Sequence, residues 1–201
     1  MVLQRLTSTV LATTILVFFS EKAFWYPQGY ALLELLLFYS LPVYATLWAF
    51  DYFHVRRLRT AILVGALYAF LVEGVLTPVI FEAGLLDPFM PAYFIGWHGL
   101  FSVVFGWFLL RRWLTRGRWG RIAIGSLLFG LLWGMWSITY WLPENAEEFA
   151  RPVQWPVADF ARHAFTFTLM LAVAHWLWGR IVRPETFRPG RLETGAVILV
   201  M

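Results

Sequence analysis

The sequence predicts an all-α integral membrane protein, a bundle of about six transmembrane helices. Hydrophobic residues make up 60% of the 201 residues and charged residues only 14%, and the mean hydropathy is +0.66. This composition leaves too few polar side chains to cover a soluble core. In addition, apolar runs of about 20 residues, the length at which a helix crosses a bilayer, recur along the chain.

Six such runs define the domain organisation. They cover residues 6–25, 31–53, 61–84, 93–114, 122–142 and 158–179, and a short cytoplasmic tail follows at 180–201. The first run is long for a secretory signal and lacks a small-x-small cleavage site, so we interpret it as a span. Because no internal repeat or long polar linker is visible, residues 1–201 are expected to form a single transmembrane domain.

The arginine positions predict the orientation. Thirteen of the 16 Lys and Arg residues lie before the first span, in alternate loops and in the tail. Cytoplasmic segments carry such an excess, so both termini are expected in the cytoplasm and the loop "PENAEEFARPVQWP" outside, in a protein of the plasma (inner) membrane. These arginines form short runs between spans rather than one basic face, so they do not indicate a nucleic-acid partner.

Familiar catalytic motifs are missing. The chain has no cysteine, which excludes a disulfide, a thiolate nucleophile and a cysteine-ligated metal. HExxH, GxSxG, P-loop and GxGxxG motifs are also absent. The stretches "FIGWH" and "GLLWGMWS" resemble short parts of the CAAX-protease-like membrane glutamate proteases. The paired-glutamate motif of that family is missing, and no family is assigned.

The third span carries an acid where the bilayer would have its centre. In "FLVEGVLTPVIFE", Glu73 lies about 18 Å from the inner edge of a hydrocarbon core about 30 Å thick. Pro78 has no N–H and its ring crowds the carbonyl of Gly74, so a kink is expected in the helix after Glu73. Such breaks in membranes face protein or a water-filled cavity. An intramembrane acid indicates a functional site by default.

Two other spans supply histidines at a similar depth. His98 stands near the start of the fourth span, and Asp159 and His163 stand one helical turn apart at the start of the sixth. Glu34 lies near the outer end of the second span. From these depths we expect four side chains to approach one another within the bundle, namely Glu34, Glu73, His98 and His163.

This predicted site has two versions. As catalytic residues, Glu73 would act as acid or base, with His98 and His163 as proton carriers. As metal ligands, Glu34, Glu73, His98 and His163 would hold a divalent ion such as zinc, iron or manganese. Haem is a less favoured cofactor, ligated axially by His98 with His163 or by His54 with His175.

The fifth span carries a helix-packing signal. Gly130 and Gly134 have the GxxxG spacing that lets a second backbone approach closely. We therefore expect this face of the span to pack within a compact bundle.

Three classes of function remain open. The first is a membrane-embedded enzyme acting on a lipid or other apolar small molecule. The second is a proton- or cation-coupled carrier in which the kinked third span binds the ion near the midplane. The third is a structural or assembly subunit of a larger membrane complex or oligomer, whose buried acids only join helices. We favour the enzyme, because the polar groups concentrate in one leaflet and come from several spans.

Overall fold

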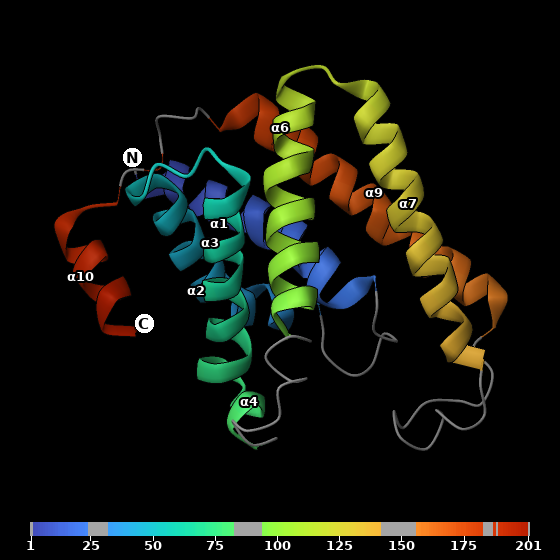
Figure 1. Cartoon of the computed structure of the whole chain (residues 1–201), viewed down its shortest axis with the longest axis horizontal. Coiled ribbons are helices and arrows are strands. Elements are labelled where there is room, and N and C mark those ends of the chain that lie inside the picture. The colour runs from blue at the N-terminus through green and yellow to red at the C-terminus, as the bar shows by residue number, and fades with distance from the viewer. Residues whose placement is uncertain are drawn as a thin grey trace.

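The computed structural model describes residues 2–23, 32–82, 94–141, 156–182, 187 and 189–200, and every regular element among them is a helix (Figure 1). The prediction of an all-α fold is confirmed for these residues. The elements in chain order are α1 (Val2–Val17), η1 (Phe18–Lys22), α2 (Leu32–Tyr52), α3 (Leu58–Phe70), η2 (Leu71–Leu76), α4 (Val79–Glu82), η3 (Ile95–Leu109), α6 (Leu110–Thr115), α7 (Trp119–Ser137), η4 (Ile138–Trp141), α9 (Val157–Ile181) and α10 (Arg191–Val200). The η segments are π-helical, except η4, which is a 3₁₀-helix.

Four helices are long and apolar enough to cross a membrane. They are Leu3–Lys22, Leu32–Tyr52, Leu58–Leu76 and Val157–Ile181, at the positions of the first, second, third and sixth predicted spans. The chain is also helical at the fourth and fifth predicted spans, in η3 with α6 and in α7, but these are not among the four. The number of six spans therefore stays a prediction. Residues 143–155 of the predicted outer loop lie outside the described residues.

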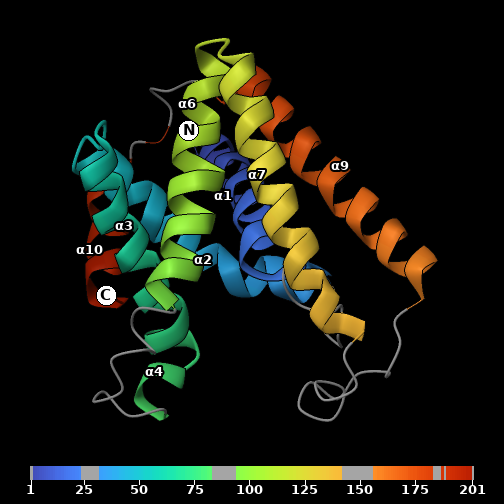
Figure 2. The same cartoon turned by 45° about the vertical axis from the view of Figure 1, so that its right-hand side comes forward.

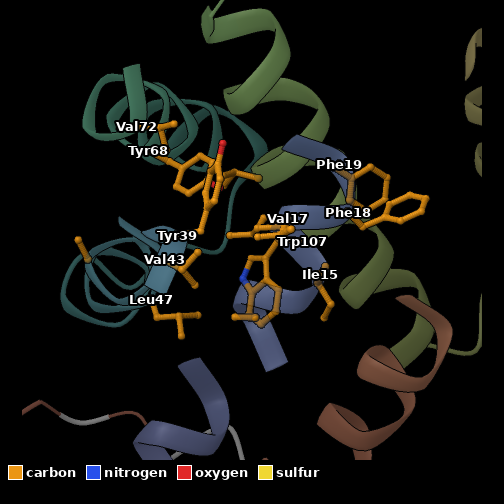
Figure 3. Packing of buried hydrophobic residues seen from close by; sticks show 14 of the residues in the cluster. Ile15, Val17, Phe18, Phe19, Tyr39, Val43, Leu47, Tyr68, Val72 and Trp107 are labelled. Carbon is orange, nitrogen blue, oxygen red and sulfur yellow. The ribbon is translucent and has the colours of Figure 1, made fainter. Parts of the chain in front are cut away.

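The core forms around the second half of α1 and its continuation η1. α1 packs against α2, η3 and α9, which places it in the interior of the bundle (Figure 2). Ile15 and Val17 are fully buried, and Phe18 and Phe19 nearly so. Figure 3 shows Phe18 and Phe19 on the side away from Tyr39 and Val43 of α2, where their rings contact Phe105 of η3 and Phe129 of α7. The many close contacts between these apolar side chains hold the described helices together.

The third helix breaks where Pro78 predicts it. The α3 helix widens into the π-helical η2, and Thr77 then adopts an extended backbone with φ −118° and ψ 111° before α4 begins. The backbone N–H and Oγ1 of Thr77 both donate to the carbonyl of Val72, at 2.9 and 2.7 Å. Thr77 thus closes the last π-helical turn, and the chain changes direction after it, so the predicted kink is confirmed.

Close helix packing uses a different glycine pair from the one that the sequence suggests. α3 crosses η3 so closely that a Cβ on Gly65 would lie 2.7 Å from the carbonyl oxygen of Gly99. By contrast, a Cβ on Gly130 or Gly134 would meet no described atom within 4 Å. The expected close contact at the GxxxG of α7 is therefore not made within the described residues. The GxxxG spacing shows that a backbone could approach, but not which helix does.

The C-terminal α10 folds back against the start of the chain. Arg5 Nη2 and Glu193 Oε1 form an ion pair of 2.8 Å, and Trp48 Nε1 donates to Thr194 Oγ1 at 3.3 Å. Val197 is buried and lines a small apolar pocket together with residues of α2 and η2. The apolar end of the predicted tail thus packs on the bundle (Figure 1).

Candidate functional site

Three π-helical segments bring ionisable side chains into one region. Glu21 belongs to η1, Glu73 to η2 and His98 to η3. In a π-helix the backbone hydrogen bonds run from i to i+5, and such segments are frequent at functional sites. The close crossing of α3 and η3 at Gly65 and Gly99 sets the position of the last two.

Glu73 and His98 are directly hydrogen-bonded. His98 Nε2 lies 2.7 Å from Glu73 Oε1, and Thr77 Oγ1 lies 3.1 Å from the other carboxyl oxygen, Oε2. The single hydroxyl proton of Thr77 is shared between Oε2 and the Val72 carbonyl. His98 is 3% exposed, and its Nδ1 has no hydrogen-bond partner among the described residues. The carboxyl group is therefore held in place by groups on both oxygens, and a proton can be shared between the carboxyl and the ring.

Two buried tyrosines flank the imidazole. The ring centroids of Tyr39 and Tyr68 lie 6.5 and 6.2 Å from that of His98, and Figure 3 shows the two phenols side by side. The hydroxyl of Tyr39 donates to the carboxyl of Glu21. Glu21 is close enough to interact electrostatically with both Glu73 and His98. A second carboxyl group thus belongs to the same cluster.

A buried hydroxyl network lies next to this cluster. Ser20 Oγ lies 3.2 Å from the Tyr68 hydroxyl and 2.9 Å from Ser102 Oγ. Trp97 Nε1 donates to the carbonyl of Ser20 at 3.1 Å. These bonds join η1, α3 and η3, and buried polar groups that are satisfied in this way hold a core in one arrangement. They fix the helices that carry Glu21, Glu73 and His98.

The acidic groups line a cavity of about 500 Å³ that is partly open to the outside of the bundle. Its polar lining comes from Glu21, Glu34, Glu73, Tyr39 and Thr77, and its apolar lining from Leu35, Phe38, Val72 and Val79. We call it the acidic cavity. Glu34 and Glu73, both predicted site residues, therefore face the same space. His98 stands behind Glu73 and is not among the lining residues.

His163 has a different partner from the one we expected. Its Nε2 lies 2.6 Å from the carbonyl oxygen of Lys22, and its ring contacts the tilted ring of Phe167, with 4.6 Å between the centroids. Asp159 pairs with Arg162 on the exposed face of α9. The structure thus brings Glu73 to His98 and Glu34 to the same cavity, while His163 contacts the end of η1. The catalytic roles of Glu73, His98 and His163 stay predictions.

The donor atoms do not gather as a metal site. Among the described residues, no group of three or more His, Cys, Asp or Glu side chains has a spacing that could hold a metal ion. The metal set of Glu34, Glu73, His98 and His163 therefore stays a prediction. The Nε2 atoms of His98 and His163 are each occupied by a protein partner, so this arrangement does not favour axial haem ligation by the pair.

Sequence reasoning did not select Glu21 or the tyrosines. Glu21 ends an apolar span at about the depth of the other acids, and Ser20 precedes it, so its depth was a usable signal. Tyr39 and Tyr68 lie in apolar helices, where an aromatic residue more often indicates packing than a polar contact.

Comparison with protein-family models, with curated proteins and with solved structures finds no match for this chain. The proposals that follow therefore rest on its geometry.

Proposed function

We propose that the chain is a multi-pass membrane enzyme in which Glu73, assisted by His98, performs acid–base chemistry on a lipid or other apolar molecule. One observation carries the proposal. The Glu73 carboxyl both lines an open cavity with apolar walls and is hydrogen-bonded at 2.7 Å to a buried histidine. A carboxyl group whose only role is to join helices is expected to be enclosed by those helices rather than to line a cavity.

The chemistry follows from the two sides of the carboxyl group. Toward the cavity, the ionised carboxylate can take a proton from an O–H or C–H group of a bound molecule, and the resulting carboxylic acid can return it. Behind it, His98 and Thr77 hold the group in one orientation through bonds to Oε1 and Oε2. His98 can also exchange the proton with Glu73 through its Nε2.

The cavity lining suggests the substrate class. A volume of about 500 Å³ is in the usual range for a small-molecule site, which is about 300–1,000 Å³. Leu35, Phe38 and Val72 provide apolar contact, and no Lys or Arg is among the described residues that line the cavity. Three carboxyl groups disfavour an anionic head group, so the substrate we propose has a neutral or cationic polar end and an apolar body.

We also propose the six-span topology, with both termini cytoplasmic in the plasma (inner) membrane. The start of α1 and the arginine-rich connection of α6 and α7 lie toward one end of the bundle, and α4 lies at the other (Figure 1). The ion pair of Arg5 with Glu193 joins the two terminal segments. These arrangements place arginine-rich segments at one end of the bundle, which supports the proposed orientation, because such segments stay in the cytoplasm.

Glu73→Gln tests the proposal, because it keeps the size and hydrogen-bonding capacity of the side chain but cannot take up a proton. The purified protein and its variants are placed in nanodiscs of total membrane lipid extract, and product formation is followed over time by lipid mass spectrometry. We expect conversion of one lipid or apolar species by the parent protein and a loss of at least about 100-fold in Glu73→Gln.

Asp159→Asn is the matched control, because the Asp159 side chain is 44% exposed, pairs with Arg162 and does not line the acidic cavity. It should keep full activity. If Glu73→Gln instead leaves both turnover and stability unchanged, the carboxyl has no catalytic role and the proposal is wrong.

A carrier is the second candidate, because Glu21, Glu34 and Glu73 line one cavity. Clustered carboxyl groups bind protons or a cation to relieve their mutual repulsion. Proteoliposomes with an internal pH-sensitive dye separate the two functions. A proton flux that Glu73→Gln abolishes, without any chemical change in the lipids, would favour the carrier.

A further inference from the structure

A second cavity, of about 550 Å³, lies between α6, α7 and α9. We call it the basic cavity. None of its lining residues lines the acidic cavity. It contains Thr115, the last residue of α6, and Arg180, near the end of α9. It therefore lies at the end of the bundle where the arginine-rich connection joins α6 to α7 (Figure 2).

Two arginines give this cavity its charge. Arg111 and Arg180 are among its lining residues, and no Asp or Glu of the described part of the chain is. Within the described residues, neither arginine has a carboxylate within ion-pair distance. Arg111 donates one hydrogen bond, from Nη1 to the carbonyl of His175 at 3.0 Å, and a guanidinium group has five N–H donors. Both guanidinium groups therefore retain donors for an anion.

His175 supplies an independent indication of a ligand. It lines the basic cavity and is 7% exposed. The backbone of Gly106 can pair with one ring nitrogen, which leaves the other without a hydrogen-bond partner among the described residues. Leaving a buried polar group without a partner is costly, so such groups usually meet a protein atom, a water molecule or a ligand.

Most of the remaining lining is apolar, with Thr115, Ser126 and Thr168 as its polar exceptions. Leu114, Ile122 and Leu171 are among the lining residues, and the ring of Trp176 lies under the Arg180 guanidinium at 5.3 Å. An anion that entered this cavity would thus have hydrocarbon walls beside its charged end. A free inorganic anion gains nothing from contact with apolar walls. A lipid with an anionic head group can place its acyl chains against them.

We propose that the basic cavity binds one anionic phospholipid, with its phosphate on Arg111, Arg180 and His175 and its acyl chains along the apolar walls. The inference rests on the membrane placement proposed above. The positive-inside orientation would put this site in the inner leaflet, where polybasic segments meet anionic lipids. Arginine pairs with phosphate through two parallel hydrogen bonds, which favours phosphate over a single-point anion.

Lipid binding to the full-length protein in detergent tests this. Native mass spectrometry and thermal denaturation are recorded with phosphatidylglycerol, with phosphatidylcholine of the same acyl chains, and with inorganic phosphate. We expect selective binding of one phosphatidylglycerol and a rise in Tm that phosphatidylcholine does not give. The double variant R111Q/R180Q should weaken phosphatidylglycerol binding by about tenfold or more.

The matched control is Arg118→Gln, which removes an exposed arginine at the same end that does not line the cavity. It should bind phosphatidylglycerol like the parent. If the double variant does not fold, the exposed Arg180→Gln alone should show a smaller loss of affinity.

Equal binding of the two phospholipids, or an equal loss in Arg118→Gln, would overturn the proposal. An equal rise in Tm with inorganic phosphate would show that no lipid is required, and would also overturn it. The result is independent of the acid–base function, because Glu73→Gln should bind phosphatidylglycerol normally whether or not the protein turns over a substrate.

Discussion

The hydroxyl of Tyr68 offers a test of the buried network at the scale of one atom. Tyr68 is fully buried, and its hydroxyl lies 3.2 Å from Ser20 Oγ. Tyr68→Phe keeps the ring packing but removes this bond, while Ser20 keeps its bond to Ser102 at 2.9 Å. We expect the free energy of unfolding to fall by about 1 kcal/mol, as for one net hydrogen bond. A denaturant titration of the detergent-solubilised protein measures it.

Tyr52→Phe is the control for that measurement, because Tyr52 is 58% exposed. It should change the unfolding free energy by less than about 0.5 kcal/mol. If Tyr68→Phe is also neutral, the bond between Tyr68 and Ser20 does not contribute to stability, and the expectation is wrong.

Residue depth was predictable from the sequence, but residue direction was not. Counting about 1.5 Å per residue along a span is enough to place Glu73 near the level of His98, and the structure joins the two. The same count places His163 at a similar level, yet its Nε2 contacts the Lys22 carbonyl. Which neighbour a side chain meets depends on the rotation of its helix and on helix packing, which periodicity alone does not determine.

At the scale of elements, the α3–η3 crossing carries the geometry of the site. A Cβ on Gly65 would lie 2.7 Å from the Gly99 carbonyl oxygen, so Gly65→Ala must push the two backbones apart. We expect a loss of about 1–3 kcal/mol in unfolding free energy. The longer separation should also weaken the Glu73–His98 hydrogen bond and reduce activity. Thermal denaturation and the lipid-turnover assay report the two effects.

Gly130→Ala is the matched control in α7. An added Cβ there meets no described atom within 4 Å, and alanine is the better helix former. The variant should be neutral or slightly more stable. A large loss of stability in Gly130→Ala would mean that another backbone covers this face of α7 and would contradict the open space seen there.

Breaks in helices were partly readable from the sequence. The kink at Pro78 can be predicted from the residue itself, because a missing N–H and a ring clash are local effects. The π-helical segments η1, η2 and η3 carry no comparable signal. Their widened turns depend on how the helices pack, and Glu21, Glu73 and His98 all lie in such turns. The ionisable residues of the site and their depths can be read from the sequence. The π-helical turns that bring them together cannot.

At the scale of the whole molecule, composition was sufficient for the fold class. An apolar chain of this kind has to satisfy its backbone within helices, and the described residues agree. The position of α10 could not have been predicted in the same way. Its 10 residues are too few to span a bilayer, and only tertiary contacts such as the ion pair of Arg5 with Glu193 place it on the bundle.

The topology can be tested directly, because the chain has no native cysteine and every introduced thiol is unique. Arg118→Cys places a thiol in the exposed connection between α6 and α7. Asn145→Cys places one in the predicted outer loop. A membrane-impermeant maleimide applied to intact cells should label Asn145→Cys at once, and Arg118→Cys only after permeabilisation, because arginine-rich segments are retained in the cytoplasm.

The reverse pattern would contradict the proposed orientation. It would place Glu73 nearer the inner surface, and each cavity would face the opposite side of the membrane. Labelling of both thiols in intact cells would mean that α7 does not cross the membrane, and would leave the four apolar helices as the spanning set.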